Sequence, residues 1–320
     1  MAFGLYEQIA RNKRDSWMLM SLIVLVLLGL GYVIGRAYWG SNSAGIGLLG
    51  VFGIFAIVWS LISYFAGAGM ALAVSGAREV THEQEPQLWN VVEEMAVAGG
   101  MPMPKVYLIE SDAANAFATG RDPQHAAVAI TRGLLQRLNR EELQGVVGHE
   151  MSHVRNYDIR FATLVGIMVG MIALIADFFL RSAFWGGGRR RGSDSGGGNA
   201  AGIFFLIALA LAVVAPIFAY MVQFAISRRR EYLADASSVE LTRNPAGLAN
   251  ALEKIAADPV PLKAANRATA HLYIANPLRG KKDKARAGLF DTHPPIQERI
   301  RILRAMAAGV APDALPTGQA

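Results

Sequence analysis

The sequence predicts a mainly α-helical membrane protein that carries a small α+β domain. Of its 320 residues, 53% are hydrophobic, and the mean hydropathy is positive, which is unusual for a water-soluble protein. Four apolar stretches are long enough to cross a bilayer, for which a helix needs about 20 residues. Between the second and third stretches, the apolar pattern changes from the helical period to that of short strands.

The first two apolar stretches, 17–38 and 46–74, predict a transmembrane hairpin within residues 1–75. Three basic residues precede the first stretch, as in a secretory signal. The stretch is too long for a signal and has no convincing cleavage site, so we interpret it as an uncleaved anchor. Because basic residues favour the cytoplasmic side, we expect the N-terminus and the segment after the hairpin to be cytoplasmic.

The second pair of apolar stretches, 161–180 and 202–226, forms a hydrophobic segment at 161–226. Its linker, 182–201, is rich in glycine and arginine, and the arginines oppose its export. We interpret it as a flexible linker rather than a phosphate-binding loop, because no strand precedes it and no helix start follows in register. Asp177 is costly in lipid, which indicates contact with other helices or a place near the interface.

Residues 76–160 predict the first part of a cytoplasmic domain. A helix opens it, with Pro86 in the first turn and the glycine pair 99–100 at its end. Asn139, with Glu142 three residues later, predicts a capping box that begins another helix. Three short strands lie between the two helices, as in a small antiparallel sheet: KVYLIE (105–110), NAFAT (115–119) and AAVAIT (126–131).

The capped helix contains VVGHEMSHVRN (146–156). A spacing of four puts His149 and His153 on one face, where both can bind one metal ion. Glu150 lies about 100° around the helix from His149, on the apolar side, and a buried carboxylate needs a partner. A zinc-bound water supplies one, because zinc lowers its pKa and the carboxylate can take its proton. Chance is the alternative in a chain with six histidines, and the capped helix argues against it.

A catalytic zinc site needs a third protein ligand and an open position. The chain has no cysteine, so that ligand must be nitrogen or oxygen, and no other histidine stands close to the motif. The segment SRRREYLADA (227–236) puts Glu231 and Asp235 one turn apart on a predicted helix. Glu231 is a candidate ligand, and Asp235 is a candidate acceptor for the second ring proton of a ligand histidine. Taken alone, the pair fits surface charge beside arginines better.

Four motifs occur among the apolar stretches in this order: NAFATG (115–120), HEMSH (149–153), RRREYLADA (228–236) and THPP (292–295). In this combination, nearly the whole chain resembles the HtpX family of membrane-bound zinc metalloproteases. The resemblance implies a thermolysin-like (gluzincin) peptidase domain. It implies one Zn²⁺ bound by His149, His153 and Glu231, with Glu150 as the general base and Asp235 behind a ligand histidine.

The resemblance also implies an endopeptidase of the bacterial inner membrane with a cytoplasmic active site. Its partners would be the lipid bilayer and unfolded or misfolded membrane proteins, in protein quality control. A nucleic-acid partner is not indicated, because the arginines lie beside apolar runs rather than in a separate basic module. A transport protein would need no zinc and would concentrate polar residues within its spans. Only the resemblance argues against a zinc hydrolase for another substrate class.

Two further roles are candidates. By resemblance, His293 stabilises the negative charge of the transition state, supported by Arg299 on the following helix, although a histidine before two prolines also fits a helix cap. An exposed edge strand can accept an extended substrate as a further strand, and a plain structural strand is the alternative. That strand consists of Asn115, Ala116, Phe117, Ala118 and Thr119.

Residues 227–308 predict the second part of the cytoplasmic domain, with helices at 245–257 and after the THPP motif. One zinc ion cannot be bound from both sides of a membrane, so the chain must cross it an even number of times between His153 and Glu231. The segment 161–226 therefore forms a complete hairpin or does not cross, and we expect a hairpin. The tail, 309–320, is predicted to be disordered.

Overall fold

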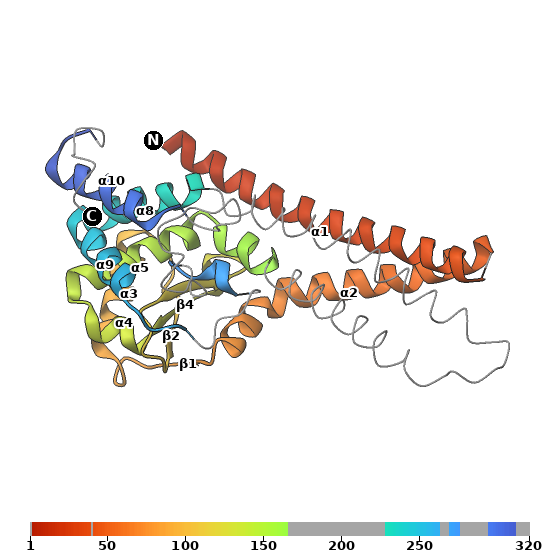
Figure 1. Cartoon of the computed structure of the whole chain (residues 1–320), viewed down its shortest axis with the longest axis horizontal. Coiled ribbons are helices and arrows are strands. Elements are labelled where there is room, and N and C mark those ends of the chain that lie inside the picture. The colour runs from red at the N-terminus through yellow and green to blue at the C-terminus, as the bar shows by residue number, and fades with distance from the viewer. Residues whose placement is uncertain (1, 40, 166–227, 263–268, 276–293, 312–320) are drawn as a thin grey trace.

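The computed structural model describes residues 2–39, 41–165, 228–262, 269–275 and 294–311. This part of the chain consists of a long helical hairpin that projects from a body made of one sheet and several helices (Figure 1). The chain is mainly helical with a small sheet, as predicted. Most of the second apolar pair, including Asp177 and the linker 182–201, lies outside the described residues, as does the end of the tail.

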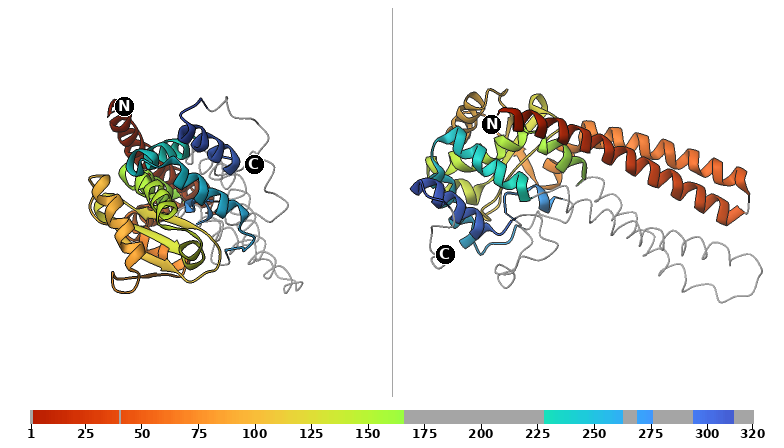
Figure 2. Two further views of the ribbon diagram at one scale, coloured as in Figure 1. Left: turned by 90° about the vertical axis from the view of Figure 1, so that its left-hand side faces the viewer. Right: turned by 90° about the horizontal axis from the view of Figure 1, so that it is seen from above.

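The hairpin consists of α1 (Ala2–Trp39) and α2 (Asn42–Val74), which lie side by side (Figures 1 and 2). Close approach near the turn depends on Gly35, where a Cβ would lie 2.5 Å from the carbonyl oxygen of Ala44. Among the described helices, α2 is the one whose length and composition suit a membrane span. Only 22% of its most apolar window is buried, so it is not the core helix of a soluble body.

The sheet has four strands in the order β1-β2-β4-β3, and it is mixed. β2 pairs with β4 in parallel, whereas the β1–β2 and β3–β4 pairs are antiparallel. The predicted antiparallel sheet is therefore wrong at its centre. All six residues of β4 are buried, so this strand takes an interior position between β2 and β3, as parallel pairing requires. The bounds are β1 (Ala77–Glu79), β2 (Lys105–Ile109), β3 (Ala116–Gly120) and β4 (Ala126–Thr131).

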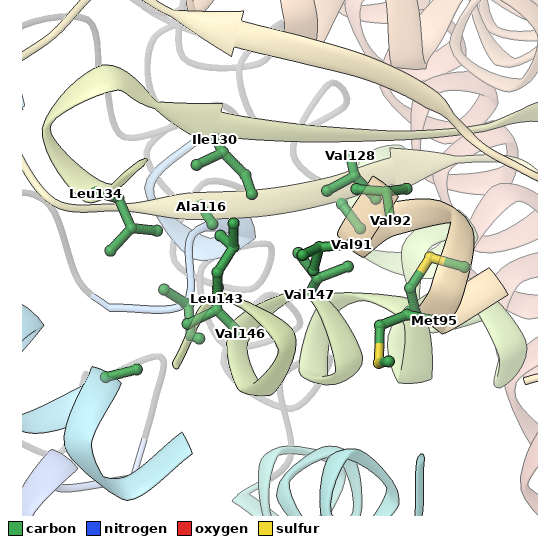
Figure 3. Close-up of a cluster of buried hydrophobic side chains, with 14 of the residues drawn as sticks. Val91, Val92, Met95, Ala116, Val128, Ile130, Leu134, Leu143, Val146 and Val147 are labelled. Atoms are coloured by element: carbon green, nitrogen blue, oxygen red, sulfur yellow. The ribbon is translucent and has the colours of Figure 1, made fainter. Parts of the chain in front are cut away.

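The main core lies between the sheet and two helices, α3 (Pro86–Ala98) and α5 (Arg140–Arg155) (Figure 3). α3 begins at the predicted proline and ends before the predicted glycines. At the start of α5, Asn139 and Glu142 form the predicted capping box, with both hydrogen bonds at 2.9 Å. The apolar side of α5 faces the sheet, which fixes the direction in which the motif side chains point.

Four further α-helices of the described residues belong to the body: α4 (Arg132–Arg137), α8 (Arg228–Thr242), α9 (Pro245–Ala257) and α10 (Ile296–Ala308). α8 and α9 pack against α5, and α10 packs against α9. α9 begins at the predicted cap, since the Asn244 side chain accepts a hydrogen bond from Gly247 N–H at 3.1 Å. α5 is therefore enclosed by elements from both halves of the sequence.

The contact between α5 and α9 depends on Gly145. A Cβ there would lie 2.7 Å from the backbone nitrogen of Leu248, too close for two well-packed helices. We expect Gly145→Ala to lower the free energy of unfolding by about 1–3 kcal/mol, measured as thermal unfolding in detergent. The control is Gly50→Ala in α2, where an added Cβ would have no neighbour within 4 Å among the described residues. This variant should show only the gain in stability from the higher helix propensity of alanine. Equal stability of the two variants would contradict this packing.

Candidate metal centre

The two motif histidines meet Glu231 where α5 packs against α8. His149 and His153 project from one face of α5, with their Nε2 atoms 3.2 Å apart. Glu231, in the first turn of α8, places carboxylate oxygens 3.7 Å from Nε2 of His149 and 3.6 Å from Nε2 of His153. One candidate ligand atom from each residue lies within 4.8 Å of the others. The fold thus brings together the three residues that the resemblance assigns to the metal.

The donor set fits a zinc ion with an open position. Two imidazole nitrogens and one carboxylate oxygen are ligands that zinc accepts in catalytic sites. Oε1 of Glu150, beside the cluster, is buried and has no hydrogen-bond partner among the described residues. A buried carboxylate oxygen without a partner is costly, and a water bound at the open position would donate to it. The predicted direction of Glu150 is also observed, because its exposed fraction is 1%.

Asp235 and Arg299 lie behind His149. Oδ1 of Asp235 is 2.9 Å from Nδ1 of His149, so the Nε2 atom of that ring is left to face the cluster. Arg299 donates two hydrogen bonds to Asp235, at 2.7 and 2.9 Å, and a third to the carbonyl oxygen of Ile274 at 3.1 Å. Its guanidinium also approaches Glu231 at 3.4 Å. One buried arginine therefore contacts two carboxylates of α8, those of Glu231 and Asp235.

The electrostatics suit these placements. Burial and the charge of Arg299 lower the pKa of His149 to about 4, so the imidazole is neutral at pH 7, as a metal ligand must be. Burial opposes ionisation of Asp235, but Arg299 and His149 hold its pKa far below the usual range. Burial raises the pKa of Glu150 to about 7, which suits a group that takes up and returns a proton near neutral pH.

His153 has an acidic partner that the sequence analysis missed. Nδ1 of His153 lies 3.0 Å from Oδ2 of Asp158. Burial alone would lower the pKa of His153, but Asp158 and the neighbouring glutamates raise it to about 9, so this ring must release a proton when it binds a metal ion. α5 ends at Arg155 with Asn156 as its C-cap, and Tyr157 adopts a positive φ of 61°, which turns the chain back toward the last turn of α5. The sequence signal is an acidic residue shortly after the motif, but its return to the helix depends on that turn.

Of the two candidates for transition-state stabilisation, His293 and Arg299, the structure describes only Arg299. His293 lies outside the described residues. Arg299 is only 1% exposed, and its hydrogen bonds go to Asp235 and Ile274. It lies behind the cluster and is not among the residues that line the pocket within the described part of the chain.

A pocket opens at the cluster, lined by residues of α5, the start of α8 and the segment 271–274. His271, to which the sequence analysis gave no function, is one of its lining residues. Its Nε2 lies 2.8 Å from the carbonyl oxygen of Ala162, and burial lowers its pKa. No motif marks this histidine, because only the fold brings it to the pocket.

The segment predicted as an exposed edge strand, 115–119, overlaps β3 at the edge of the sheet. Its edge is covered in part, at Ala116 and Phe117. Ile274 donates its backbone N–H to the carbonyl oxygen of Ala116 at 2.9 Å, and Tyr273 forms a β-bridge with Phe117. The covering segment is distant in sequence, so local pattern cannot reveal it. The side chains of this segment are all buried: Asn115, Ala116, Phe117, Ala118 and Thr119.

Ala118 is the next residue of β3 whose backbone points to the same side as that of Ala116. In an antiparallel pair, every second residue of a strand directs its backbone N–H and C=O away from the partner strand. The Ala118 backbone forms a hydrogen bond with Glu150, and the residue lines the pocket. By contrast, the side chain of Thr119 forms a buried hydrogen bond, with Oγ1 2.8 Å from Oγ1 of Thr163. The strand edge at Ala118 therefore faces the cluster.

Comparison with known proteins agrees with this geometry. The sequence profile of "Peptidase family M48" matches residues 82–307. A "Protease HtpX homolog" of Listeria monocytogenes (serovar 1/2a) is 46% identical over 308 residues, covering 94% of this chain and 100% of the relative. Its namesakes in Ligilactobacillus salivarius and Levilactobacillus brevis are 47% and 48% identical, with the same coverage. The crystal structure of S. mikatae Ste24p gives a TM-score of 0.48 at 17% identity, covering 93% of this chain and 67% of that one. The chain belongs to peptidase family M48.

Proposed function

We propose that the chain is a zinc-dependent endopeptidase of the bacterial cytoplasmic membrane that cleaves unfolded or misfolded membrane proteins. The observation that carries this proposal is the meeting of His149, His153 and Glu231 beside the buried carboxylate of Glu150. A transport protein has no need for three metal-binding side chains next to an unpaired carboxylate oxygen. Membership of a peptidase family supports peptide bonds as the substrate.

The chemistry follows from the residues of the chain. Bound zinc supplies Lewis acidity and lowers the pKa of water. Glu150 takes a proton from the attacking water and later passes it to the leaving amine, and its pKa near 7 suits both transfers. Asp235 and Asp158 each hold Nδ1 of one ligand histidine, which directs both Nε2 atoms to the same point. Arg299 keeps Asp235 ionised and in place.

The substrate would bind as an extended strand along the uncovered part of β3. The covering segment already occupies the edge at Ala116, so we place the substrate at Ala118, whose backbone lies beside Glu150. Recognition through backbone hydrogen bonds does not depend on side-chain identity. An unfolded segment of almost any sequence would therefore fit, provided that it is extended.

We place the metal site on the cytoplasmic side of the membrane. In our proposal, residues 1–75 form one transmembrane hairpin and 161–226 a second, with the parts 76–160 and 227–308 together on the cytoplasmic face. α2 satisfies the length and composition of a span. The cluster joins His153 to Glu231, so the number of crossings between them is even.

Cysteine labelling tests the second hairpin. The chain has no cysteine, so single variants give an unambiguous signal. We expect Ser193→Cys and Ser195→Cys to react with a membrane-impermeant reagent added to intact cells. Gln136→Cys, at an exposed position of the cytoplasmic domain, should react only after permeabilisation. Protection of both linker positions in intact cells would contradict a crossing hairpin.

Cleavage in defined vesicles tests the function. The purified protein is reconstituted with one membrane protein, either native or unfolded by heating, and the fragments are followed by gel electrophoresis. We expect cleavage of the unfolded form, its loss on treatment with a zinc chelator, and its return on adding zinc. Equal cleavage of both forms would contradict selection for unfolded chains. Bound zinc without any peptide cleavage would favour a hydrolase for another substrate class.

A further inference from the structure

Helix α1 makes a contact that anchoring in a membrane does not explain. We propose that Asn12 is a positioning residue for the metal centre, which holds Asp158 in the orientation that fixes the ligand His153. The zinc site is then complete only when the N-terminal part of α1 contacts the turn that follows α5. This inference rests on the zinc site proposed above.

The contact is a continuous chain of hydrogen bonds. Nδ2 of Asn12 donates to Oδ1 of Asp158 at 2.7 Å and to the carbonyl oxygen of Asn156 at 2.8 Å. A side-chain amide has two N–H donors, so both are used. The other oxygen of Asp158, Oδ2, accepts from Nδ1 of His153 at 3.0 Å. Asn12 is fully buried, at 0% exposure, so water does not compete for these bonds.

Asp158 needs external support because of the backbone that carries it. It follows Tyr157, whose positive φ of 61° is unfavourable for an aromatic side chain. Asn12 binds both sides of this turn, through the carbonyl of Asn156 before it and the carboxylate of Asp158 after it. The next residue of α1, Lys13, places its ammonium 4.1 Å from the centre of the Tyr157 ring. Two successive α1 residues therefore contact the turn that orients Asp158.

The neutral amide also suits the electrostatics. Arg230 also faces Asp158, with Nε 3.8 Å from Oδ1, and it approaches Asp15 of α1 at 3.9 Å. Asn12 satisfies an oxygen of the buried carboxylate without adding a second cation. The other carboxylate oxygen of Asp158 is left to accept from His153, the usual arrangement of a carboxylate behind a zinc ligand.

The test measures zinc affinity of the full-length protein in detergent, by competition with a fluorescent zinc chelator. A direct partner of a ligand histidine affects metal affinity by about 10–100-fold, and Asn12 acts one bond further away. We therefore expect Asn12→Ala to weaken zinc binding by about 3–10-fold. The matched control is Ser16→Ala, one turn further along the buried face of α1, whose hydroxyl donates within the helix to the Asn12 carbonyl. It should bind zinc as tightly as wild type.

A double-mutant comparison with Asp158 shows whether Asn12 acts through that carboxylate or only by holding α1 against the body. If Asn12 acts through Asp158, Asn12→Ala adds no further loss of zinc affinity in an Asp158→Ala background. Asn12→Asp should weaken zinc binding more than Asn12→Ala, because it opposes two carboxylates at 2.7 Å. Adding Asp158→Asn to Asn12→Asp should restore part of the affinity, since the amide at 158 can donate to position 12 and accept from His153.

The outcomes distinguish this inference from the proposed function. If wild type binds no zinc, the proposed function fails. If wild type binds zinc and Asn12→Ala binds it equally well, only the role of Asn12 is overturned. An additive loss in the Asp158→Ala background would also overturn it. If Asn12→Ala does not fold, the exchanged pair, Asn12→Asp with Asp158→Asn, is the deciding variant. Zinc affinity no higher than that of Asn12→Asp alone would overturn the role of Asn12.

Discussion

Glu150→Gln should leave zinc bound and abolish peptide cleavage. The amide has nearly the shape of the carboxylate but cannot take a proton from water. General-base catalysis contributes about 10²–10⁴-fold, so we expect kcat to fall by at least about 10²-fold. Removing the charge does not touch the cluster of His149, His153 and Glu231, so zinc content should stay at the wild-type value. The measurement is cleavage of an unfolded protein such as casein, together with metal analysis of the same sample.

Glu141→Gln is the matched control for this substitution. Glu141 lies in the first turn of the same helix and is exposed, and its carboxylate contacts Asn244 at 3.2 Å rather than the cluster. It should retain both zinc and cleavage. Wild-type cleavage by Glu150→Gln would show that this carboxylate is not the base. Loss of zinc from Glu150→Gln would show that it helps to bind the metal.

Arg299→Leu should destabilise the body strongly. It removes the cation that donates two hydrogen bonds to Asp235 and leaves a carboxylate of 2% exposure without its main partner. Breaking a buried ion pair from one side costs about 3–5 kcal/mol. We expect a loss of this size in the free energy of unfolding, measured by denaturant titration in detergent. Zinc binding should weaken too, because Asp235 no longer holds His149.

Two further variants test the reason for this loss. Arg301→Leu, on the same helix, removes a partly exposed pair with Glu298 and should cost less than about 1 kcal/mol. Combining Arg299→Leu with Asp235→Leu removes both buried charges and should recover part of the stability, without recovering zinc affinity. If the double variant is as unstable as Arg299→Leu, the unpaired charge of Asp235 is not the cause.

The local part of the fold could be predicted from sequence. Helix α3, the capping box at Asn139 and the start of α9 at Pro245 are all where the pattern placed them. The reason is that caps, proline and periodicity act within a few residues. The same holds for His149, His153 and Glu150, because helix geometry alone determines which way they point.

Contacts between distant segments could not be predicted in the same way. Strand spacing does not reveal which strands are neighbours, so the parallel β2–β4 pair at the centre of the sheet was missed. The cover on β3 comes from Tyr273 and Ile274, far along the chain. Asp158 and Asn12 reach the site through a turn and a helix packing that have no motif. Spacing made Glu231 a candidate ligand, but only the family resemblance favoured that role over surface charge, because its surroundings in the sequence are those of a surface helix.

Zinc content of wild type and Glu231→Ala tests the central claim most directly. Both proteins are purified in detergent without chelator, checked for equal secondary structure by circular dichroism, and analysed for metal by mass spectrometry. We predict one zinc per wild-type chain and a large loss in Glu231→Ala, because two histidines on one helix turn are left without their third ligand. Full zinc occupancy in Glu231→Ala, or none in wild type, would contradict a metal site formed where α5 meets α8.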